Sequence, residues 1–254
     1  MFDIGANLTS SHFSKDLDAV VNDSFTAGVE KICVTSSNLD EVKNAKKITE
    51  KYENLYYSVG FHPHNAKDFK IEFLKDMSIY LDDPKAICLG EMGLDFNRNF
   101  SSKEEQILCF ESQLSLANSI NKPLFLHQRD AHEEFLNVLD NYEFNQKLIV
   151  HCFTGNLSEL EDYLKRDFYI GITGWVCDLK RGKELRECIN HIPKDKLLIE
   201  TDSPYLSPRK KIRRNEPKFL IDVAEEVATL RHETNESIIN SSYENSLDFF
   251  NLHR

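Results

Sequence analysis

Ala86-Ile-Cys-Leu-Gly-Glu-Met-Gly-Leu-Asp-Phe96 is the stretch of this chain that best predicts its fold. Its first four residues form a short apolar run, which is typical of a buried strand. The run ends in Gly-Glu-Met-Gly, which predicts that the strand stops there and that the Glu91 carboxylate emerges at a sharp turn. An acid in such a place must be paired, hydrogen-bonded or bound to a metal, because an isolated buried charge is very costly. Taken alone, however, Glu91 is better explained as an ordinary loop residue in water.

Three other apolar runs end in the same way. Leu-Phe-Leu precedes His127, Leu-Ile-Val precedes His151, and Leu-Leu-Ile-Glu-Thr precedes Asp202. For any one of these histidines, a hydrogen-bonded structural role is the commoner explanation. Four potential metal ligands in one repeated structural position nevertheless predict a shared site.

Strand-like runs alternate with amphipathic helical patterns from one end of the chain to the other. Asn38 is a predicted N-cap, and Ser102 with Glu105 forms a predicted capping box. The predicted strands are residues 2–5, 31–35, 55–60, 86–89, 123–126, 148–150, 168–172 and 197–199. The predicted helices are residues 15–27, 38–48, 71–81, 102–117, 130–139, 158–165, 183–189, 217–230 and 236–250.

Eight strand–helix units of about 32 residues each match the size of a (β/α)8 barrel. We therefore predict the α/β class and a (β/α)8 TIM barrel, as a single domain over residues 1–254 with an extra C-terminal helix. A doubly wound open sheet is the competitor, but it usually has a Gly-rich phosphate turn after the first strand, which we do not find. In a barrel, all strands open at their C-terminal ends onto one face, so the four potential ligands should meet there.

Composition limits the classes of function. A hydrophobic fraction of 41% over 254 residues is enough for a sizeable core. The six cysteines form no Cys-x-x-Cys pair, which favours a reduced, cytoplasmic protein. No signal peptide and no apolar run of membrane-spanning length is visible, so we expect no membrane partner. The net charge of −11 argues against a broad grip on duplex nucleic acid but leaves room for a local phosphate site.

The four potential ligands also indicate which cation they suit. Two imidazoles and two carboxylates fit Zn²⁺, Mn²⁺ or iron, and fit Mg²⁺ less obviously because Mg²⁺ prefers oxygen ligands.

Several longer motifs resemble those of a known family. They are Phe61-His-Pro-His64, Gly90-Glu-Met-Gly-Leu-Asp95, His127-Gln-Arg-Asp-Ala131, His151-Cys-Phe-Thr-Gly155 and Glu200-Thr-Asp-Ser-Pro204. Over essentially the whole chain they resemble the TatD family of metal-dependent deoxyribonucleases, within the amidohydrolase-like group of metal-dependent hydrolases. Residues 3–10 and the run Arg214-Asn-Glu-Pro217 resemble the TatD branch more than its paralogues.

The resemblance implies a site and an activity. The metal positions of the family correspond here to Glu91, His127, His151 and Asp202. The implied activity is hydrolysis of phosphodiester bonds in single-stranded DNA, or RNA, by a 3′-to-5′ exonuclease, with a role in DNA repair or degradation. The implied cofactor is a divalent metal ion, Mg²⁺ in activity with Mn²⁺ or Zn²⁺ as alternatives. The expected partners are single-stranded DNA or RNA ends, and a monomer is favoured.

The chain departs from the family pattern at the first strand. Most relatives carry His-x-His there, as half of a second metal site, whereas this chain has Gly5 and Asn7. We therefore expect one well-held metal on Glu91, His127 and His151. The catalytic residues would be Glu91 and Asp202. The metal would lower the pKa of an attacking water, and Asp202 would accept its proton as general base.

The substrate-binding residues are predicted with plainer alternatives beside them. His62 and His64 follow the third strand and would grip phosphate, although a simple turn explains them about as well. Arg129 would reach a phosphate, or form an ion pair with Asp130.

A basic segment follows the eighth strand. Residues 209–214 contain five basic side chains in six, and Arg214 with Asn215 ends this predicted phosphate-binding loop. A solvated basic face is the alternative. Trp175 and Phe153 would stack nucleobases, although packing is the more common role of such aromatic residues.

Two other functions stay open at this stage. The first is a small-molecule hydrolase acting on an amide, ester or lactone, since one fold hosts many chemistries. The second is a non-catalytic partner-binding protein that lost activity together with the first-strand histidines.

Overall fold

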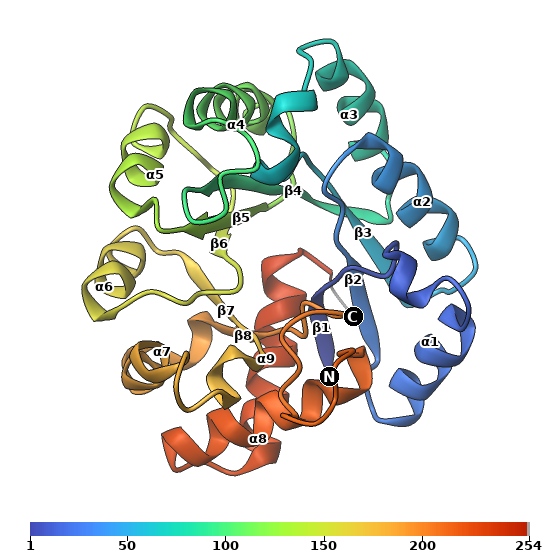
Figure 1. The fold of residues 1–254 in the computed structure, drawn as a ribbon, viewed down its shortest axis with the longest axis vertical. Helices are drawn as coiled ribbons and strands as arrows, with labels where there is room; N and C mark the ends of the chain where they lie inside the picture. The colour runs from blue at the N-terminus through green and yellow to red at the C-terminus, as the bar shows by residue number, and fades with distance from the viewer. Residues whose placement is uncertain (253–254) are drawn as a thin grey trace. The chain divides into compact units, whose positions relative to one another are not determined.

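Strands and helices alternate along the computed structural model, which describes residues 1–252 (Figure 1). Two compact units make up the fold: Met1–Val34 with Cys152–Arg254, and Thr35–His151.

The strands are β1 (Phe2–Ala6), β2 (Lys31–Val34), β3 (Leu55–Val59), β4 (Ala86–Asp95), β5 (Leu124–Arg129), β6 (Leu148–Val150), β7 (Tyr169–Ile172) and β8 (Leu197–Ile199). The α-helices are α1 (Leu17–Thr26), α2 (Leu39–Thr49), α3 (Phe73–Leu81), α4 (Lys103–Ala117), α5 (His132–Leu139), α6 (Leu157–Lys165), α7 (Lys183–Cys188), α8 (Leu220–Arg231) and α9 (Asn235–Phe249). The 3-10 helices are η1 (Ser11–Phe13), η2 (Pro63–Asp68), η3 (Gly174–Cys177), η4 (Ile189–His191), η5 (Lys194–Lys196) and η6 (Pro217–Phe219).

The order of the strands decides the fold class. Within residues 1–252, the strands form one eight-stranded sheet in the order of the chain, β1 to β8. The pairs β1–β2, β3–β4, β4–β5, β5–β6 and β7–β8 are parallel. A doubly wound sheet would reverse its strand order at a switch point. Sequential parallel strands with a helix after each are the topology of the (β/α)8 barrel, so the predicted fold class is confirmed.

The Thr35–His151 unit contains β3 to β6. Helices α2 to α5 lie along the outer side of these strands (Figure 1). Between α4 and α5 the rings of Phe110 and Phe135 stack with their centroids 5.5 Å apart, and both rings are fully buried. Because the four strands are parallel, their carboxyl ends reach the same edge of the unit, which brings their polar side chains together.

Strand β4 is longer than the sequence predicted. It continues through Gly90 and Glu91 to Asp95, and β5 likewise continues through His127 to Arg129. The prediction that Glu91 and His127 end their strands is therefore wrong. Gly90 and Gly93, which suggested a turn, instead let two backbones approach closely: a Cβ would lie 2.1 Å from the Phe125 carbonyl oxygen at Gly90, and 1.9 Å from that of His127 at Gly93.

The other unit joins the two ends of the chain. A parallel bridge links Ala6 of β1 to Ser203, just after β8. Helix α9 packs against β8 and β1, where the rings of Phe2 and Phe250 lie 5.3 Å apart. Helices α8 and α9 both follow β8. A single domain over residues 1–254 with an extra C-terminal helix stays a prediction.

Local signals for helix ends are confirmed. The Asn38 side chain accepts hydrogen bonds from the backbone N–H groups of Asp40 and Glu41, and Ser102 forms a capping box with Glu105. Among the residues that the structure describes, no helix has the length and apolar character needed to cross a membrane.

Candidate metal centre

Glu91 lies at the centre of a group of histidines in the Thr35–His151 unit. Its side chain is buried, and its Oε1 atom is 2.7 Å from His151 Nε2 and 3.0 Å from His127 Nδ1. His62 Nε2 lies 3.1 Å from the same oxygen. The ring atoms His127 Nδ1 and His151 Nε2 are themselves 3.2 Å apart. Three imidazole nitrogens thus surround one carboxylate oxygen.

The pairing of neighbouring strands explains this convergence. His127 is in register with Gly93 of β4, two residues beyond Glu91. His151 directly follows β6, and its backbone N–H donates to the carbonyl of Leu126 at 2.9 Å. His62 follows β3 and caps η2 by accepting the backbone N–H of His64. Each ligand candidate is therefore fixed by backbone contacts of its own segment.

The donor set fits a divalent cation. Ligand atoms bound at about 2.1 Å around one ion lie about 3 to 3.5 Å from one another, and the separations found here, 2.7–3.2 Å, are close to that spacing. His62, Glu91 and His127 form a group whose ligand atoms all lie within 4.8 Å of one another. Imidazoles with a carboxylate suit Zn²⁺, Mn²⁺ and iron. His62, which the sequence suggested as a substrate contact, thus lies among the potential ligands.

Burial and mutual contacts set the charges of these side chains. Burial lowers the pKa of His62 to about 4, so its imidazole is neutral at pH 7. Burial alone would raise the pKa of Glu91, but His151 and His62 hold it well below its ordinary value. Burial opposes protonation of His127, yet the carboxylates of Asp95 and Glu91 beside its ring raise its pKa. An anionic Glu91 beside a neutral His62 is the state in which both can bind a cation.

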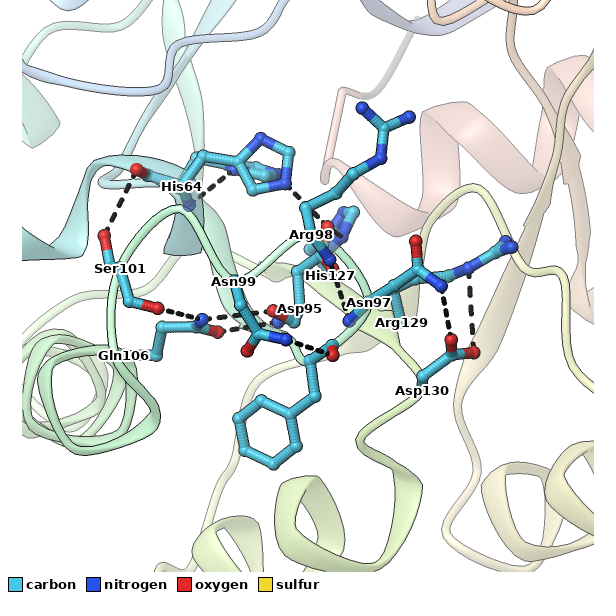
Figure 2. Close-up of polar contacts among 12 residues, drawn as sticks. His64, Asp95, Asn97, Arg98, Asn99, Ser101, Gln106, His127, Arg129 and Asp130 are labelled. Atoms are coloured by element: carbon cyan, nitrogen blue, oxygen red, sulfur yellow. Dashed lines mark hydrogen bonds and ion pairs between the residues drawn. The ribbon is translucent and has the colours of Figure 1, made fainter.

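Asp95, at the end of β4, is a functional candidate that the sequence analysis missed. Its Oδ2 atom is 2.6 Å from His64 Nε2 and 3.6 Å from His127 Nε2 (Figure 2). Burial opposes the charged carboxylate, but the nearby imidazoles of His127 and His64 lower the pKa of Asp95 well below its ordinary value. The His127 ring has Nδ1 beside Glu91 and Nε2 on the side of Asp95. Asp95 and His127 therefore form a carboxylate–histidine pair beside the candidate metal position. The sequence signal that could have indicated Asp95 is the run Gly-Leu-Asp, which continues the motif around Glu91.

Arg129 is the last residue of β5, and its side chain lies close to that of Asp130. Its Nε atom is 3.7 Å from Asp130 Oδ1, and Asn97 Nδ2 donates to Asp130 Oδ2 at 2.6 Å (Figure 2). The ion pair with Asp130, the plainer of the two alternatives, is therefore present.

Asp202 belongs to the other unit. It follows β8 with φ of 51°, a left-handed conformation that is uncommon outside glycine. Its backbone N–H donates to the carbonyl of Gly5, and its Oδ1 accepts a hydrogen bond from Asn7 Nδ2 at 2.8 Å. The Asn7 side chain thus orients the Asp202 carboxylate.

The basic segment after β8 is largely held by the protein itself. Both terminal nitrogens of Arg214 donate to Asp16, at 2.9 and 2.8 Å, and one also donates to Glu216. Asn215 is buried and donates to the carbonyl of Thr201 at 2.8 Å. Arg209 pairs with Asp222. These contacts fix the loop, and Arg214 and Asn215 stay proposals as substrate contacts.

The two aromatic residues suggested for base stacking have partners in the protein. Phe153 is buried and packs edge-on against Tyr163, with the ring centroids 6.1 Å apart. Trp175 Nε1 donates to the carbonyl of Arg181, whose guanidinium lies over the indole at 4.6 Å. Phe153 is thus packed in the protein, whereas Trp175 is half-buried and base stacking by it stays a prediction.

Comparison with known proteins decides the family. The model of the TatD-related DNase family matches residues 2–251. This chain belongs to that family. Proteins named 3′-5′ ssDNA/RNA exonuclease TatD are 45% identical in Escherichia fergusonii and 44% in Escherichia coli K12, each over 239 residues and 92% of both chains.

Solved structures of TatD-family proteins have the same fold. A TatD family hydrolase from Entamoeba histolytica is 28% identical, covers 98% of this chain and 97% of its own, and has a TM-score of 0.90. The TatD homologue YJJV from Escherichia coli K12 is 26% identical, covers 100% and 98%, and has a TM-score of 0.92. The predicted (β/α)8 barrel is therefore the fold of this TatD-family chain.

Proposed function

We propose that this protein is a metal-dependent nuclease that removes nucleotides from the 3′ ends of single-stranded DNA or RNA. The observation that carries the proposal is the convergence of Glu91, His127 and His151 on one space between parallel strands. The TatD relatives, whose names describe this activity, support it. DNA repair or DNA degradation would use such an enzyme.

Glu91, His127 and His151 would hold the cation, with His62 as a further ligand. A divalent cation bound there would polarise a phosphoryl oxygen and lower the pKa of a water molecule. Three nitrogen donors and one oxygen suit Mn²⁺ or Zn²⁺, while Mg²⁺ is the activating ion that the family resemblance implies. The cytoplasmic location and the monomeric state expected from the sequence belong to the same proposal.

The remaining residues would orient ligands and move protons. The Asp95 carboxylate, 3.6 Å from His127 Nε2, would favour a proton on Nε2 and so keep Nδ1 available as a ligand atom. Asp202, oriented by Asn7, would accept a proton from the attacking water. His64, held by Asp95, and Arg129 would contact the substrate phosphate.

A labelled single-stranded oligonucleotide tests the proposal. With Mn²⁺ or Mg²⁺ we expect stepwise shortening from an open 3′ end, a block by a phosphorothioate 3′ end, and a complete loss with chelator. Glu91→Gln should abolish the reaction, whereas Glu104→Gln, the same change on the exposed face of α4, should not. Turnover of amides, esters or lactones with no action on the oligonucleotide would refute the proposal in favour of a small-molecule hydrolase.

A further inference from the structure

The loop between β4 and α4, residues 96–101, is fixed at both ends by buried contacts. At its start, Asp95 Oδ1 accepts the backbone N–H groups of Asn97 at 3.0 Å and Arg98 at 2.8 Å (Figure 2). Gln106, only 1% exposed, accepts the N–H of Asp95 and donates to the carbonyls of Asp95 and Ser101. Ser101 Oγ donates to the carbonyl of His64 at 3.2 Å. The loop is thus tied to the segment that carries His64.

Phe100 presents an exposed aromatic ring on this anchored loop. Its side chain is 56% exposed, although it lies edge-on against the His64 ring with centroids 4.9 Å apart. The His64 ring is in turn 6.3 Å from that of His127, a proposed metal ligand. Leaving a large apolar side chain in water forfeits hydrophobic stabilisation. An exposed ring in a fixed position beside a candidate active site is suited to contact with an apolar, planar ligand group.

Arg98 adds a positive charge to the same loop. Its backbone is held by Asp95, its side chain is exposed, and its guanidinium has no ion-pair or hydrogen-bond partner among residues 1–252. Figure 2 shows it extending away from Asn97, Arg129 and Asp130. Elsewhere the arginines with side-chain ion pairs include Arg181, Arg186, Arg209, Arg214 and Arg231. In a chain of net charge −11, an unengaged guanidinium on a rigid loop suits a phosphate group.

We propose that the 96–101 loop binds the nucleotide at the end of the strand: Phe100 stacks on its base and Arg98 contacts a backbone phosphate. This inference rests on the proposed nuclease function and names the residues that recognise its substrate. Every nucleobase has a π-face, so stacking on Phe100 binds strand ends without selecting a sequence. Phe100 would thus have the base-stacking role that the sequence suggested for Trp175 and Phe153, whose rings have partners in the protein.

Oligonucleotides that end in a normal nucleotide or in an abasic one test the stacking. Removing a stacked aromatic ring costs about 1–3 kcal/mol, so Phe100→Ala should raise KM for the normal end by about 5- to 150-fold. It should leave KM for the abasic end nearly unchanged, and Phe100→Trp should restore the preference. Leu108→Ala is the matched control, because Leu108 is 63% exposed on α4 of the same unit. Equal effects of Phe100→Ala on both substrates would overturn the stacking role.

A binding measurement decides the inference separately from the reaction. A strand with 2-aminopurine at its 3′ end should lose fluorescence when it binds the wild-type protein in the presence of chelator, which prevents cleavage. The loss of fluorescence should be much smaller with Phe100→Ala. Equal quenching by both proteins would refute the stacking, even if the strand is cleaved normally. Normal quenching, with no cleavage once Mn²⁺ or Mg²⁺ is added back in excess, would instead refute the nuclease function and leave the binding surface in place.

The contact of Arg98 with phosphate predicts a change in salt dependence. Each phosphate contact on a single strand contributes a slope of about −0.7 to log affinity against log salt concentration. Arg98→Gln should therefore make this slope shallower by about 0.7, whereas Lys75→Gln, a matched loss of charge on exposed α3, should not. An unchanged slope for Arg98→Gln would remove Arg98 from the proposed surface.

Discussion

Asp95→Asn is the substitution that tests most sharply how the metal ligands are oriented. Asp95 Oδ1 accepts two backbone N–H groups, while Oδ2 lies 2.6 Å from His64 Nε2 and 3.6 Å from His127 Nε2. If the amide oxygen of the substituted side chain keeps the backbone contacts, its NH₂ group must face both imidazoles. His127 then loses the negative charge that lies 3.6 Å from its Nε2 and favours a proton there, and it is driven toward the tautomer that is protonated on Nδ1, the atom next to Glu91.

The expected magnitude follows from this change of tautomer. Loss of the partner that orients a metal-binding histidine typically costs 10- to 100-fold in metal affinity, or about 1.4–2.8 kcal/mol. We expect a loss in this range for Asp95→Asn, because His127 would be one of three or four ligands.

Competition with a chelating dye measures this loss. Mn²⁺ affinity of wild type and Asp95→Asn would be compared with that of Asp130→Asn, which removes a carboxylate near the same loop but without contact to His127. Thermal unfolding of the metal-free proteins separates a ligand effect from general destabilisation. Wild-type Mn²⁺ affinity in a folded Asp95→Asn protein would refute the assigned role of Asp95.

Three further predictions concern other residues. Asp202→Asn should abolish turnover and leave the metal content of the purified protein intact, as elemental analysis can check; loss of the metal would make Asp202 a ligand instead. His62→Ala should weaken Mn²⁺ binding at least tenfold, whereas a raised KM with normal metal affinity would return His62 to a substrate contact. Burial raises the pKa of Asp3 to about 8 although Thr201 donates hydrogen bonds to it, and this value lies above the ordinary pKa of an unfolded Asp. Protonated Asp3 therefore stabilises the fold below about pH 4, and this contribution is lost as the pH rises toward 8. The unfolding free energy of Asp3→Asn, relative to wild type, should thus rise by roughly 1.4 kcal/mol per pH unit in this window, as urea titrations at several pH values can measure; a constant difference would contradict the assigned pKa.

The sequence predicted the strand order and the grouping of Glu91, His127 and His151. Both follow from short apolar runs, because such a run is a local signal and the carboxyl ends of parallel strands share one edge. The sequence did not predict that β4 continues through Glu91. Gly90 and Gly93 are typical of a turn, and only the structure shows that they let the backbone of β5 approach β4 closely.

Other features depend on contacts that no local pattern contains. Asp95 faces His64 and His127 only because β4 extends to residue 95. Phe100 is placed beside His64 by Gln106 and Ser101, whose hydrogen bonds span the loop and the segment after β3. Arg214 stands in a basic run, and only the structure shows that both of its terminal nitrogens donate hydrogen bonds to Asp16, which is distant in sequence.

Anomalous diffraction from a crystal soaked in Mn²⁺ is the most direct test of the central claim, that Glu91 and the histidines around it hold a metal ion. We expect a peak about 2.0–2.3 Å from Glu91 Oε1, His127 Nδ1 and His151 Nε2. A peak elsewhere, or no peak between these side chains, would contradict it.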